Sequence, residues 1–257
     1  MPYATSFERL LTILNELREK CPWDRKQTIH TLRPLTIEET YELADAIDRE
    51  DWDGICEEAG DILLHLVFYA RLGQEAGHFT IDDVLERVGN KLVARHPHIY
   101  GGTQVADEND VKRNWEALKL KEGKKSILAG VPEAFPALPK ATRLQEKARQ
   151  AGFDWEHAAD VRAKVAEELS ELDEAVASGN KAAMQDELGD LLFSVVNYAR
   201  FLDLDPEAAL ESTNRKFKRR FEQVEQRALA AGNPMPGTPL DVLDQYWNEA
   251  KKASGHE

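Results

Sequence analysis

Hydrophobic residues recur at helical spacing along most of the chain, and few segments alternate strictly between hydrophobic and polar residues. In one clear stretch, Val161, Val165, Leu169, Leu172 and Val176 follow one another at steps of four, four, three and four residues. Such steps place all five side chains on one face of an amphipathic helix. The pattern therefore predicts an all-α fold.

A second helix is predicted over the next hydrophobic stretch, which runs from Leu188 to Tyr198. The tripeptide Ser-Gly-Asn at 178–180 separates the two helices. Gly179 is suited to end the first helix, because glycine adopts the left-handed conformation that helix ends often need. We therefore expect an antiparallel helix hairpin that turns at Gly179.

The same organisation occurs twice along the chain. Residues 37–43 (IEETYEL) resemble 166–172 (AEELSEL), and residues 57–71 (EEAGDILLHLVFYAR) resemble 186–200 (DELGDLLFSVVNYAR). Both pairs are offset by 129 residues. Because a fixed offset over two blocks is the signature of an internal repeat, two copies of one helical domain are the simplest interpretation.

Three prolines between the copies indicate where the domains meet. They fall in the segment 122–139 and disfavour a continuous helix there. We therefore predict an N-terminal domain over residues 1–121, a proline-containing linker over 122–139 and a C-terminal domain over 140–257.

Composition narrows the range of partners. The 257-residue chain has a net charge of −14 at pH 7, which argues against direct binding of nucleic acid. Its two cysteines are typical of reduced thiols in a cytoplasmic protein. We expect neither a secretory signal nor a membrane span, because the N-terminus lacks the signal pattern and the longest hydrophobic stretch is short.

Each copy carries the carboxylate pattern Glu-Glu-x-x-Glu, then fifteen residues, then Glu-x-x-Asp. In the C-terminal copy, Glu171 and Glu187 each lie eight residues from Gly179, and Glu168 and Asp190 each lie eleven. The hairpin therefore brings these four carboxylates to matched heights. Clustered carboxylates repel one another unless a cation lies among them. Oxygen ligands without histidine favour a hard divalent cation such as Mg²⁺.

A solvated acidic helix face is the alternative for a single copy, because glutamate is a good helix former. Two copies with identical spacing, each beside a hydrophobic face, favour the metal site. The equivalent carboxylates of the N-terminal copy are Glu38, Glu39, Glu42, Glu58 and Asp61.

Basic residues accompany the carboxylates. Lys216 and Arg220 share one helix face, and cations beside an acidic metal site suggest a polyphosphate held between them. Lys164 precedes Glu168 by four residues, a spacing that is equally typical of a simple i,i+4 salt bridge.

Aromatic residues add a further pair. Trp247 and Lys251 could be a packing aromatic and a surface charge, or the tryptophan could stack on a nucleobase. The N-terminal copy repeats both basic and aromatic pairs with the same internal spacing, as Lys91 with Arg95 and Trp115 with Lys119.

Together these motifs resemble the MazG family of nucleoside triphosphate pyrophosphohydrolases. The resemblance rests on the doubled carboxylate pattern, ELGDLLFSVVNYAR (187–200), NRKFKRRF (214–221) and CPWD (21–24), and it covers nearly the whole chain. It implies tandem helical-bundle domains and a homodimer. It also implies magnesium-dependent conversion of NTPs and dNTPs to monophosphates plus pyrophosphate, with Mn²⁺ as a substitute, in nucleotide-pool sanitation or adjustment under stress.

Carried over residue by residue, the resemblance makes Glu168, Glu171, Glu187 and Asp190 the metal ligands. The nucleotide contacts that it implies are Lys164, Glu167, Glu168, Asn197, Lys216, Arg220, Trp247 and Lys251. We assign catalysis to Glu167 together with Glu168 and Glu171. Glu167 is the candidate that positions or deprotonates the attacking water, although it could instead bind the substrate or a second metal.

The resemblance also implies that the C-terminal copy is the active one, and two differences between the copies agree. At the offset of 129 residues, Lys164 corresponds to Leu35, and Asn197 corresponds to Phe68. We therefore expect the N-terminal copy to bind metal weakly, to turn over little substrate, and to serve assembly or regulation.

Two other functions stay open at this point. One is a nucleotide-sensing or adaptor protein whose metal site has no catalytic role. The other is a related pyrophosphatase selective for dUTP or a dCTP. Ligand spacing does not distinguish them, because base selectivity depends on the shape of the pocket.

Overall fold

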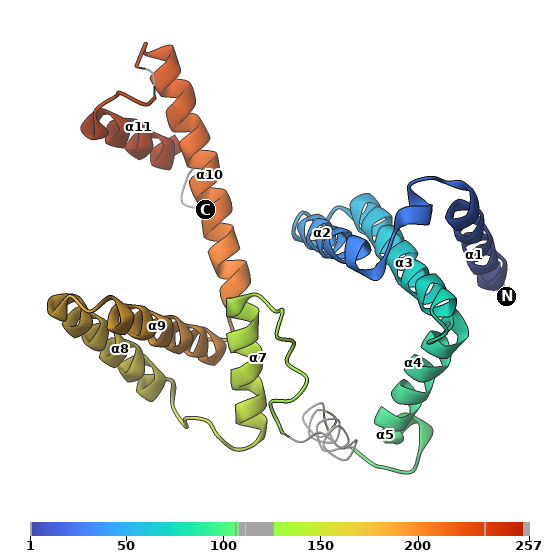
Figure 1. The fold of residues 1–257 in the computed structure, drawn as a ribbon. Coiled ribbons are helices and arrows are strands. Elements are labelled where there is room, and N and C mark those ends of the chain that lie inside the picture. Colours follow the sequence, from blue (N-terminus) through green and yellow to red (C-terminus); the bar gives the residue numbers. More distant parts are fainter. Residues whose placement is uncertain (1, 106, 108–110, 112–125, 234, 254–257) are drawn as a thin grey trace. The chain divides into compact units, whose positions relative to one another are not determined.

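The computed structural model describes residues 2–105, 107, 111, 126–233 and 235–253. All regular structure in these ranges is helical, which confirms the predicted all-α fold (Figure 1). The chain divides into two compact units, residues 1–110 (unit 1) and residues 111–257 (unit 2). No helix in the described ranges is both long and apolar enough to cross a membrane.

Unit 1 is organised around one central helix. Its elements are α1 (Pro2–Lys20), the 3₁₀ turn η1 (Asp24–Lys26), α2 (Ile29–Asp48), α3 (Trp52–Glu75), α4 (Ile81–Arg95) and α5 (Pro97–Tyr100). The central helix α3 packs on α1, α2 and α4. The buried core of unit 1 consists of Leu14, Leu32, Val67, Phe68 and Leu72. The hydrophobic faces of α1, α2 and α3 thus form one core.

Side-chain caps determine where the two carboxylate-bearing helices of unit 1 begin. The hydroxyl of Thr28 accepts a hydrogen bond from the amide of Thr31, and Asp51 accepts one from the amide of Gly54. Such caps satisfy amide groups that have no partner inside the helix, and each typically stabilises a helix by about 1 kcal/mol. The caps therefore fix the first residues of α2 and α3, which pack on each other.

Unit 2 contains the predicted hairpin and a second pair of helices. Its elements are α7 (Ala137–Gln150), α8 (Ala158–Ser178), α9 (Lys181–Phe201), α10 (Pro206–Ala230) and α11 (Leu240–Ala253). Helices α8 and α9 pack along each other and turn at Gly179, whose φ of 73° lies in the left-handed region. Asn180 then caps α9 by accepting hydrogen bonds from the amides of Ala182 and Ala183. The hairpin and its turn residue are therefore as predicted.

Helix α7 packs against α9 and α10. It begins at Ala137, so the last three residues of the predicted linker are helical. Pro139 lies in the first turn, where its missing amide hydrogen costs no helix hydrogen bond. Gln145 donates a hydrogen bond to the carbonyl of Phe193 on α9 at 2.8 Å, and α7 also packs on α10.

Helices α10 and α11 form the second hairpin. Asp205 caps α10, with Pro206 in the first helical position. The side chain of Asn233 donates to the hydroxyl of Tyr246 at 2.9 Å and closes the loop between the two helices. The buried residues Val224, Ala228 and Ala250 lie on these two helices.

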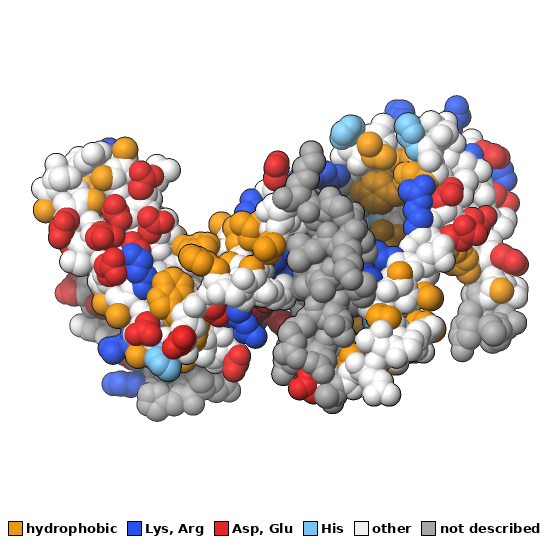
Figure 2. Space-filling model, turned by 90° about the horizontal axis from the view of Figure 1, so that it is seen from below, with side chains coloured by type: hydrophobic (Ala, Val, Ile, Leu, Met, Phe, Trp, Pro, Cys, Tyr) orange, Lys and Arg blue, Asp and Glu red, His pale blue; other side chains and the backbone are white. Residues whose placement is uncertain are grey.

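The α8–α9 hairpin leaves a hydrophobic face uncovered within unit 2. Large hydrophobic side chains that are between 44% and 56% exposed are Leu169, Val176, Leu188, Leu192, Phe193 and Val195. Hydrophobic and acidic side chains mix on the surface at the left of Figure 2. A hairpin that carries this many exposed apolar residues has a surface suited to a partner.

Candidate metal and nucleotide site

Three of the four predicted ligands of unit 2 meet between α8 and α9. Glu168 and Glu171 come from α8 and Glu187 comes from α9, and one carboxylate oxygen of each lies within 4.8 Å of the others. Glu168 is only 5% exposed, whereas Glu171 is exposed. We call these three residues the C-terminal triad. Three oxygen donors that converge from two helices suit a hard divalent cation.

Asp190, the fourth predicted ligand, is not part of this triad in the structure. It lies on α9 one turn after Glu187, and its side chain is exposed. Asp190 shares the face of Glu187 by its spacing along the helix, but spacing does not determine whether its carboxylate reaches the triad.

Lys164 supplies the positive charge nearest to the triad. Its ammonium group lies 2.7 Å from a carboxylate oxygen of Glu168 and 2.8 Å from one of Glu167. The side chain of Glu168 is 7% exposed and that of Lys164 is 35% exposed, so the pair reaches from the interior to the surface. The simple i,i+4 salt bridge that the spacing allowed is therefore present. Glu167 is held by the same lysine and is exposed.

The charges in this cluster shift the ionisation of its members. The pKa of Glu171 is raised by partial burial and by the neighbouring charge of Glu168, against the opposing effect of Lys164. The pKa of Lys164 is raised by its hydrogen bonds to Glu167 and Glu168. The neighbouring carboxylates therefore still repel one another in spite of the lysine.

Asn197 is buried on α9 and takes part in a network that the sequence did not reveal. Its side-chain oxygen accepts hydrogen bonds from Arg200 at 2.7 and 3.1 Å, and Arg200 also pairs with Asp154. The predicted nucleotide contact is thus already held in place by an arginine one turn along the helix. The i,i+3 spacing of Asn197 and Arg200 was the available signal.

The remaining predicted nucleotide contacts lie on the other hairpin of unit 2. Lys216 and Arg220 are on α10, and Trp247 and Lys251 are on α11, whose main packing partner among the described helices is α10. The ring of Trp247 lies 5.2 Å from that of Phe217, and the ammonium group of Lys251 lies 6.0 Å from the tryptophan ring. The packing and the nucleotide-stacking interpretations of Trp247 therefore both remain, because the ring packs on Phe217 and still lies beside a cation.

Arg220 has an unusual environment for a cation. Within residues 126–233 and 235–253 of the structure, no hydrogen-bond acceptor reaches its buried Nε. Buried polar groups of this kind are normally satisfied, so the partner of this guanidinium nitrogen lies outside the described residues.

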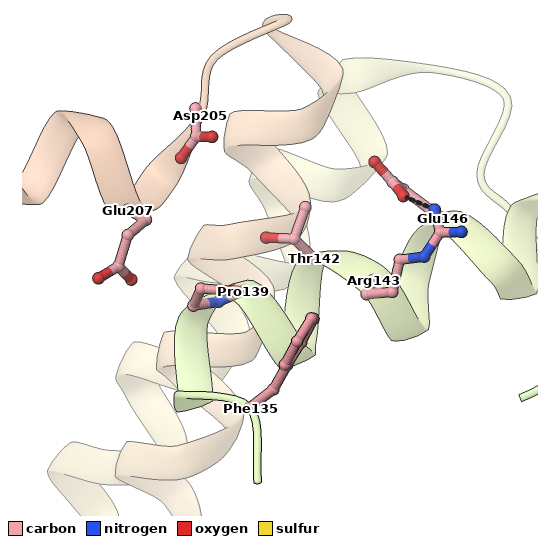
Figure 3. A pocket seen from close by; sticks show the side chains of 7 residues that line it. All are labelled: Phe135, Pro139, Thr142, Arg143, Glu146, Asp205 and Glu207. Carbon is pink, nitrogen blue, oxygen red and sulfur yellow. Dashed lines mark hydrogen bonds and ion pairs between the residues drawn. The ribbon is translucent and has the colours of Figure 1, made fainter. Parts of the chain in front are cut away.

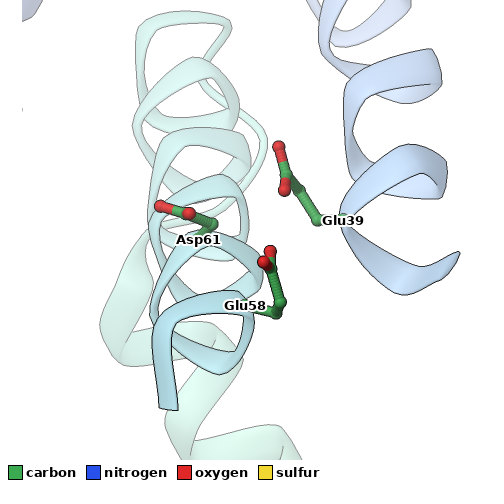
Figure 4. A group of neighbouring side chains, drawn as sticks. All are labelled: Glu39, Glu58 and Asp61. Carbon is green, nitrogen blue, oxygen red and sulfur yellow. The ribbon is translucent and has the colours of Figure 1, made fainter. Parts of the chain in front are cut away.

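Unit 1 presents a second triad, drawn in Figure 4, at the equivalent place. Glu39 extends from α2, and Glu58 and Asp61 extend from α3, again with one oxygen of each within 4.8 Å of the others. All three are partly buried. We call them the N-terminal triad. Glu38 and Glu42 of the predicted set are outside it.

No cation neutralises the N-terminal triad within residues 2–105 of the structure. Position 35, the equivalent of Lys164, is a leucine, and Glu39 makes no ion pair in this range. The pKa of Glu39 is raised, first by burial and then by Glu42 and Asp61. The pKa of Glu58 is raised in the same way, by burial and then by Glu42 and Glu39.

The other residues of the predicted second site are only partly placed. Lys91 and Arg95 lie on α4, which packs on α3. Trp115 and Lys119 lie outside the described residues, so their predicted role stays a prediction.

A cavity in unit 2 lies apart from the triad. It measures about 180 Å³ and is lined by Phe135, Pro139, Thr142, Arg143, Glu146, Asp205 and Glu207 (Figure 3). Arg143 is paired with Glu146 at 2.6 Å inside this cavity. It contains none of the predicted site residues.

The fold and the two triads define a class of protein, namely an all-α tandem repeat with one candidate metal site between α2 and α3 and another between α8 and α9. Comparison with known proteins agrees with this tandem organisation. The model of the MazG nucleotide pyrophosphohydrolase domain matches residues 27–100 and 156–225. These two segments include both triads.

Relatives cover nearly the whole chain. The nucleoside triphosphate pyrophosphohydrolase/pyrophosphatase MazG of Thermotoga maritima is 44% identical over 250 residues, which are 95% of this chain and 95% of that protein. The nucleoside triphosphate pyrophosphohydrolase of Escherichia coli K12 is 40% identical over 254 residues, 95% of this chain and 97% of that protein. Protein YabN of Bacillus subtilis is 45% identical over 252 residues, 96% of this chain and 52% of that protein. The chain belongs to the MazG family.

Proposed function

We propose that this protein is a nucleoside triphosphate pyrophosphohydrolase that converts NTPs and dNTPs to monophosphates and pyrophosphate in unit 2. The observation that carries the proposal is the C-terminal triad with Lys164 at its edge. The family match supports it, as do relatives that are named for this activity. Nucleotide-pool sanitation, or adjustment of the pools under stress, is the role that we propose for it.

The donor set of the triad fits Mg²⁺, with Mn²⁺ as a substitute. All three side chains offer hard oxygen atoms, and none offers nitrogen or sulfur. Glu168, Glu171 and Glu187 would hold the ion, and Asp190 would act from one turn away. A bound ion of this kind neutralises phosphate charge and lowers the pKa of a coordinated water.

Glu167 and the basic residues have separate proposed roles, one toward the attacking water and the other toward the leaving group. Glu167 is exposed beside the triad, and we propose that its carboxylate positions a water and accepts its proton. The water oxygen forms a bond to phosphorus as the α–β anhydride bond breaks, and the pyrophosphate oxygen takes the bonding pair. Lys216 and Arg220 would receive the leaving pyrophosphate, because cations stabilise charge on transferring phosphoryl groups.

We further propose a homodimer. The exposed hydrophobic residues of α8 and α9 form a face that needs a partner, and a second copy carries the same face. Light scattering of the full chain, compared with Leu192→Glu, tests this. A dimer that dissociates in the variant supports the proposal, and a monomeric parent protein contradicts it.

A cytoplasmic location is also proposed. Both cysteines, Cys21 and Cys56, are free thiols in the structure, which suits a reducing compartment. With a net charge of −14, small nucleotides rather than nucleic acid are the expected partners.

A substrate panel tests the activity. The full chain is incubated with each common NTP and dNTP, with and without Mg²⁺, and the products are separated. Monophosphate plus pyrophosphate from several bases supports the proposal. Release of diphosphate plus phosphate, or saturable binding without turnover as in a sensor or adaptor, contradicts it. Turnover of dUTP or a dCTP alone would indicate a base-selective pyrophosphatase.

A further inference from the structure

Lys164 forms an ion pair with Glu168, one member of the C-terminal triad. Its ammonium group lies 2.7 Å from Glu168, the most buried of the three carboxylates. A buried carboxylate is costly unless a positive partner compensates its charge. A lysine on the same helix therefore provides internally the charge that a divalent ion would otherwise provide.

The N-terminal triad lacks this arrangement. Leu35 occupies the equivalent position one turn before Glu39, and it packs against the hydrophobic core of unit 1. Within residues 2–105, Glu39 is therefore available to an incoming cation without displacement of another one. The two triads share the pairs Glu39/Glu168 and Glu58/Glu187 by their offset of 129 residues, so they differ chiefly in this charge and in their third member.

Lys164 contacts one carboxylate oxygen of Glu168, and a divalent cation bound to the same carboxylate would repel this ammonium group even through the other oxygen. We propose that Lys164 is an internal counter-cation that leaves Glu168 when the metal binds and moves to the triphosphate, so that metal and nucleotide bind cooperatively in unit 2. Its side chain is 35% exposed and flexible enough to move between the two positions. Release from Glu168 leaves Glu167 as its second anchor, 2.8 Å away in the structure.

The first half of this inference concerns metal alone, and only the second half rests on the proposed function. When metal binds before nucleotide, it must displace Lys164 from Glu168, and this displacement weakens the affinity for metal. A triphosphate offers the displaced lysine a new anionic partner, which removes that penalty. Coupling between two ligands of this kind is reciprocal and typically amounts to about 5- to 150-fold in affinity.

The test is a Mn²⁺ titration of the full chain by calorimetry, with Glu58→Gln included throughout to weaken binding in unit 1. Without nucleotide, Lys164→Met should bind Mn²⁺ at least about fivefold more tightly than the parent, whereas Lys164→Arg should resemble the parent. An unchanged or weaker affinity in Lys164→Met overturns the inference. Far-ultraviolet circular dichroism establishes that both variants are folded.

A reciprocal variant tests the same idea without altering α8. In a chain whose unit 2 carries Glu187→Gln, Leu35→Lys should weaken Mn²⁺ binding at the N-terminal triad by about fivefold or more. The matched control is Leu35→Met, which keeps the hydrophobic contact and should leave the affinity unchanged. Equal affinities of the lysine and methionine variants contradict the inference.

The nucleotide half is tested with a triphosphate whose α–β bridge is a methylene group. This analogue should tighten Mn²⁺ binding by the parent more than by Lys164→Met, and an equal gain in both contradicts the cooperative role. These titrations need no turnover. A protein that shows the shift in Lys164→Met but never releases pyrophosphate would therefore refute the proposed function while supporting the counter-cation.

Discussion

The two triads share two aligned glutamates, but the charged groups that surround them differ. Glu168 is buried against Lys164, whereas Glu39, its equivalent, is partly buried beside Glu42 and without an ion pair in the described part of unit 1. The third member also differs, since unit 2 uses Glu171 and unit 1 uses Asp61. On the function proposed above, the carboxylates provide the place for a cation, and the groups around them decide whether a polyphosphate joins it.

Removal of metal is expected to have the largest effect. Chelation with EDTA should abolish pyrophosphate release, and Mg²⁺ or Mn²⁺ should restore it. In the restored enzyme, Glu171→Gln should lower kcat at least about 100-fold, because even partners of metal ligands contribute 10- to 100-fold. The aligned variant Glu42→Gln is the control and should leave kcat almost unchanged. Equal losses of kcat in both variants would contradict the assignment of catalysis to unit 2.

The basic pair of unit 2 should have the next largest effect. Each charged contact to phosphate contributes roughly tenfold, so the double variant Lys216→Met/Arg220→Met should lower kcat/KM about 100-fold. The matched pair in unit 1 is Lys91→Met/Arg95→Met, for which we expect less than a threefold change, since about 0.6 kcal/mol is within the ordinary range of surface substitutions. Steady-state pyrophosphate release measures both. A larger loss from the unit 1 pair would indicate that the triphosphate binds in unit 1, and it would contradict this prediction.

A smaller effect on Mg²⁺ affinity is expected from substitution of Asp190. Because it lies outside the C-terminal triad in the described structure, Asp190→Asn should weaken Mg²⁺ binding by about tenfold, as partners of ligands do. Asp61→Asn, in contrast, removes a member of the N-terminal triad and should weaken metal binding there further. Calorimetric titration of each variant gives the two affinities. A loss of Mg²⁺ affinity of more than about 100-fold in Asp190→Asn would indicate that Asp190 is a direct metal ligand.

The smallest effect concerns stability at low pH. Arg71 and Arg200 are aligned, but Arg71 pairs with Glu75 together with Arg18, whereas Arg200 pairs with Asp154. The hydrogen bond from Arg18 lowers the pKa of Glu75, with a smaller contribution from Arg71. A carboxylate with a lowered pKa in the folded state stabilises the fold above its unfolded pKa, and this stabilisation is lost as pH falls through the folded pKa.

The corresponding experiment uses Glu75→Gln. At pH 7 the variant should be less stable by under about 1 kcal/mol, because the pair is partly exposed and screened. The difference should disappear at a pH well below 4.5, the ordinary pKa of a glutamate. Thermal unfolding at both pH values measures it, and a difference that is equal at both would exclude the ionic contribution.

Much of the fold was predictable, because helix spacing and turn chemistry are local. The steps between Val161 and Val176 predicted α8, and Gly179 predicted the turn, since few other residues adopt that conformation without strain. The convergence of Glu168, Glu171 and Glu187 followed from their distances to that turn. These features depend only on residues close together in the sequence.

The remaining features depend on contacts between distant segments. Whether Asp190 reaches the triad depends on its side-chain placement and on the packing of α9, which accepts a hydrogen bond from Gln145 of α7. The position of Trp247 depends on the packing of α11 on α10, and Asn197 is held through Asp154, which lies 43 residues earlier in the sequence. Spacing within one helix carries no information about such partners.

The claim that unit 2 carries the chemistry is tested most directly by one pair of aligned variants. Glu187→Gln and Glu58→Gln change the same residue type at the same place in the two triads of the full chain. Magnesium-dependent release of pyrophosphate from a mixture of dNTPs should fall at least about 100-fold in Glu187→Gln and stay within about twofold of the parent in Glu58→Gln. Full activity in Glu187→Gln, or its loss in Glu58→Gln, would contradict the account.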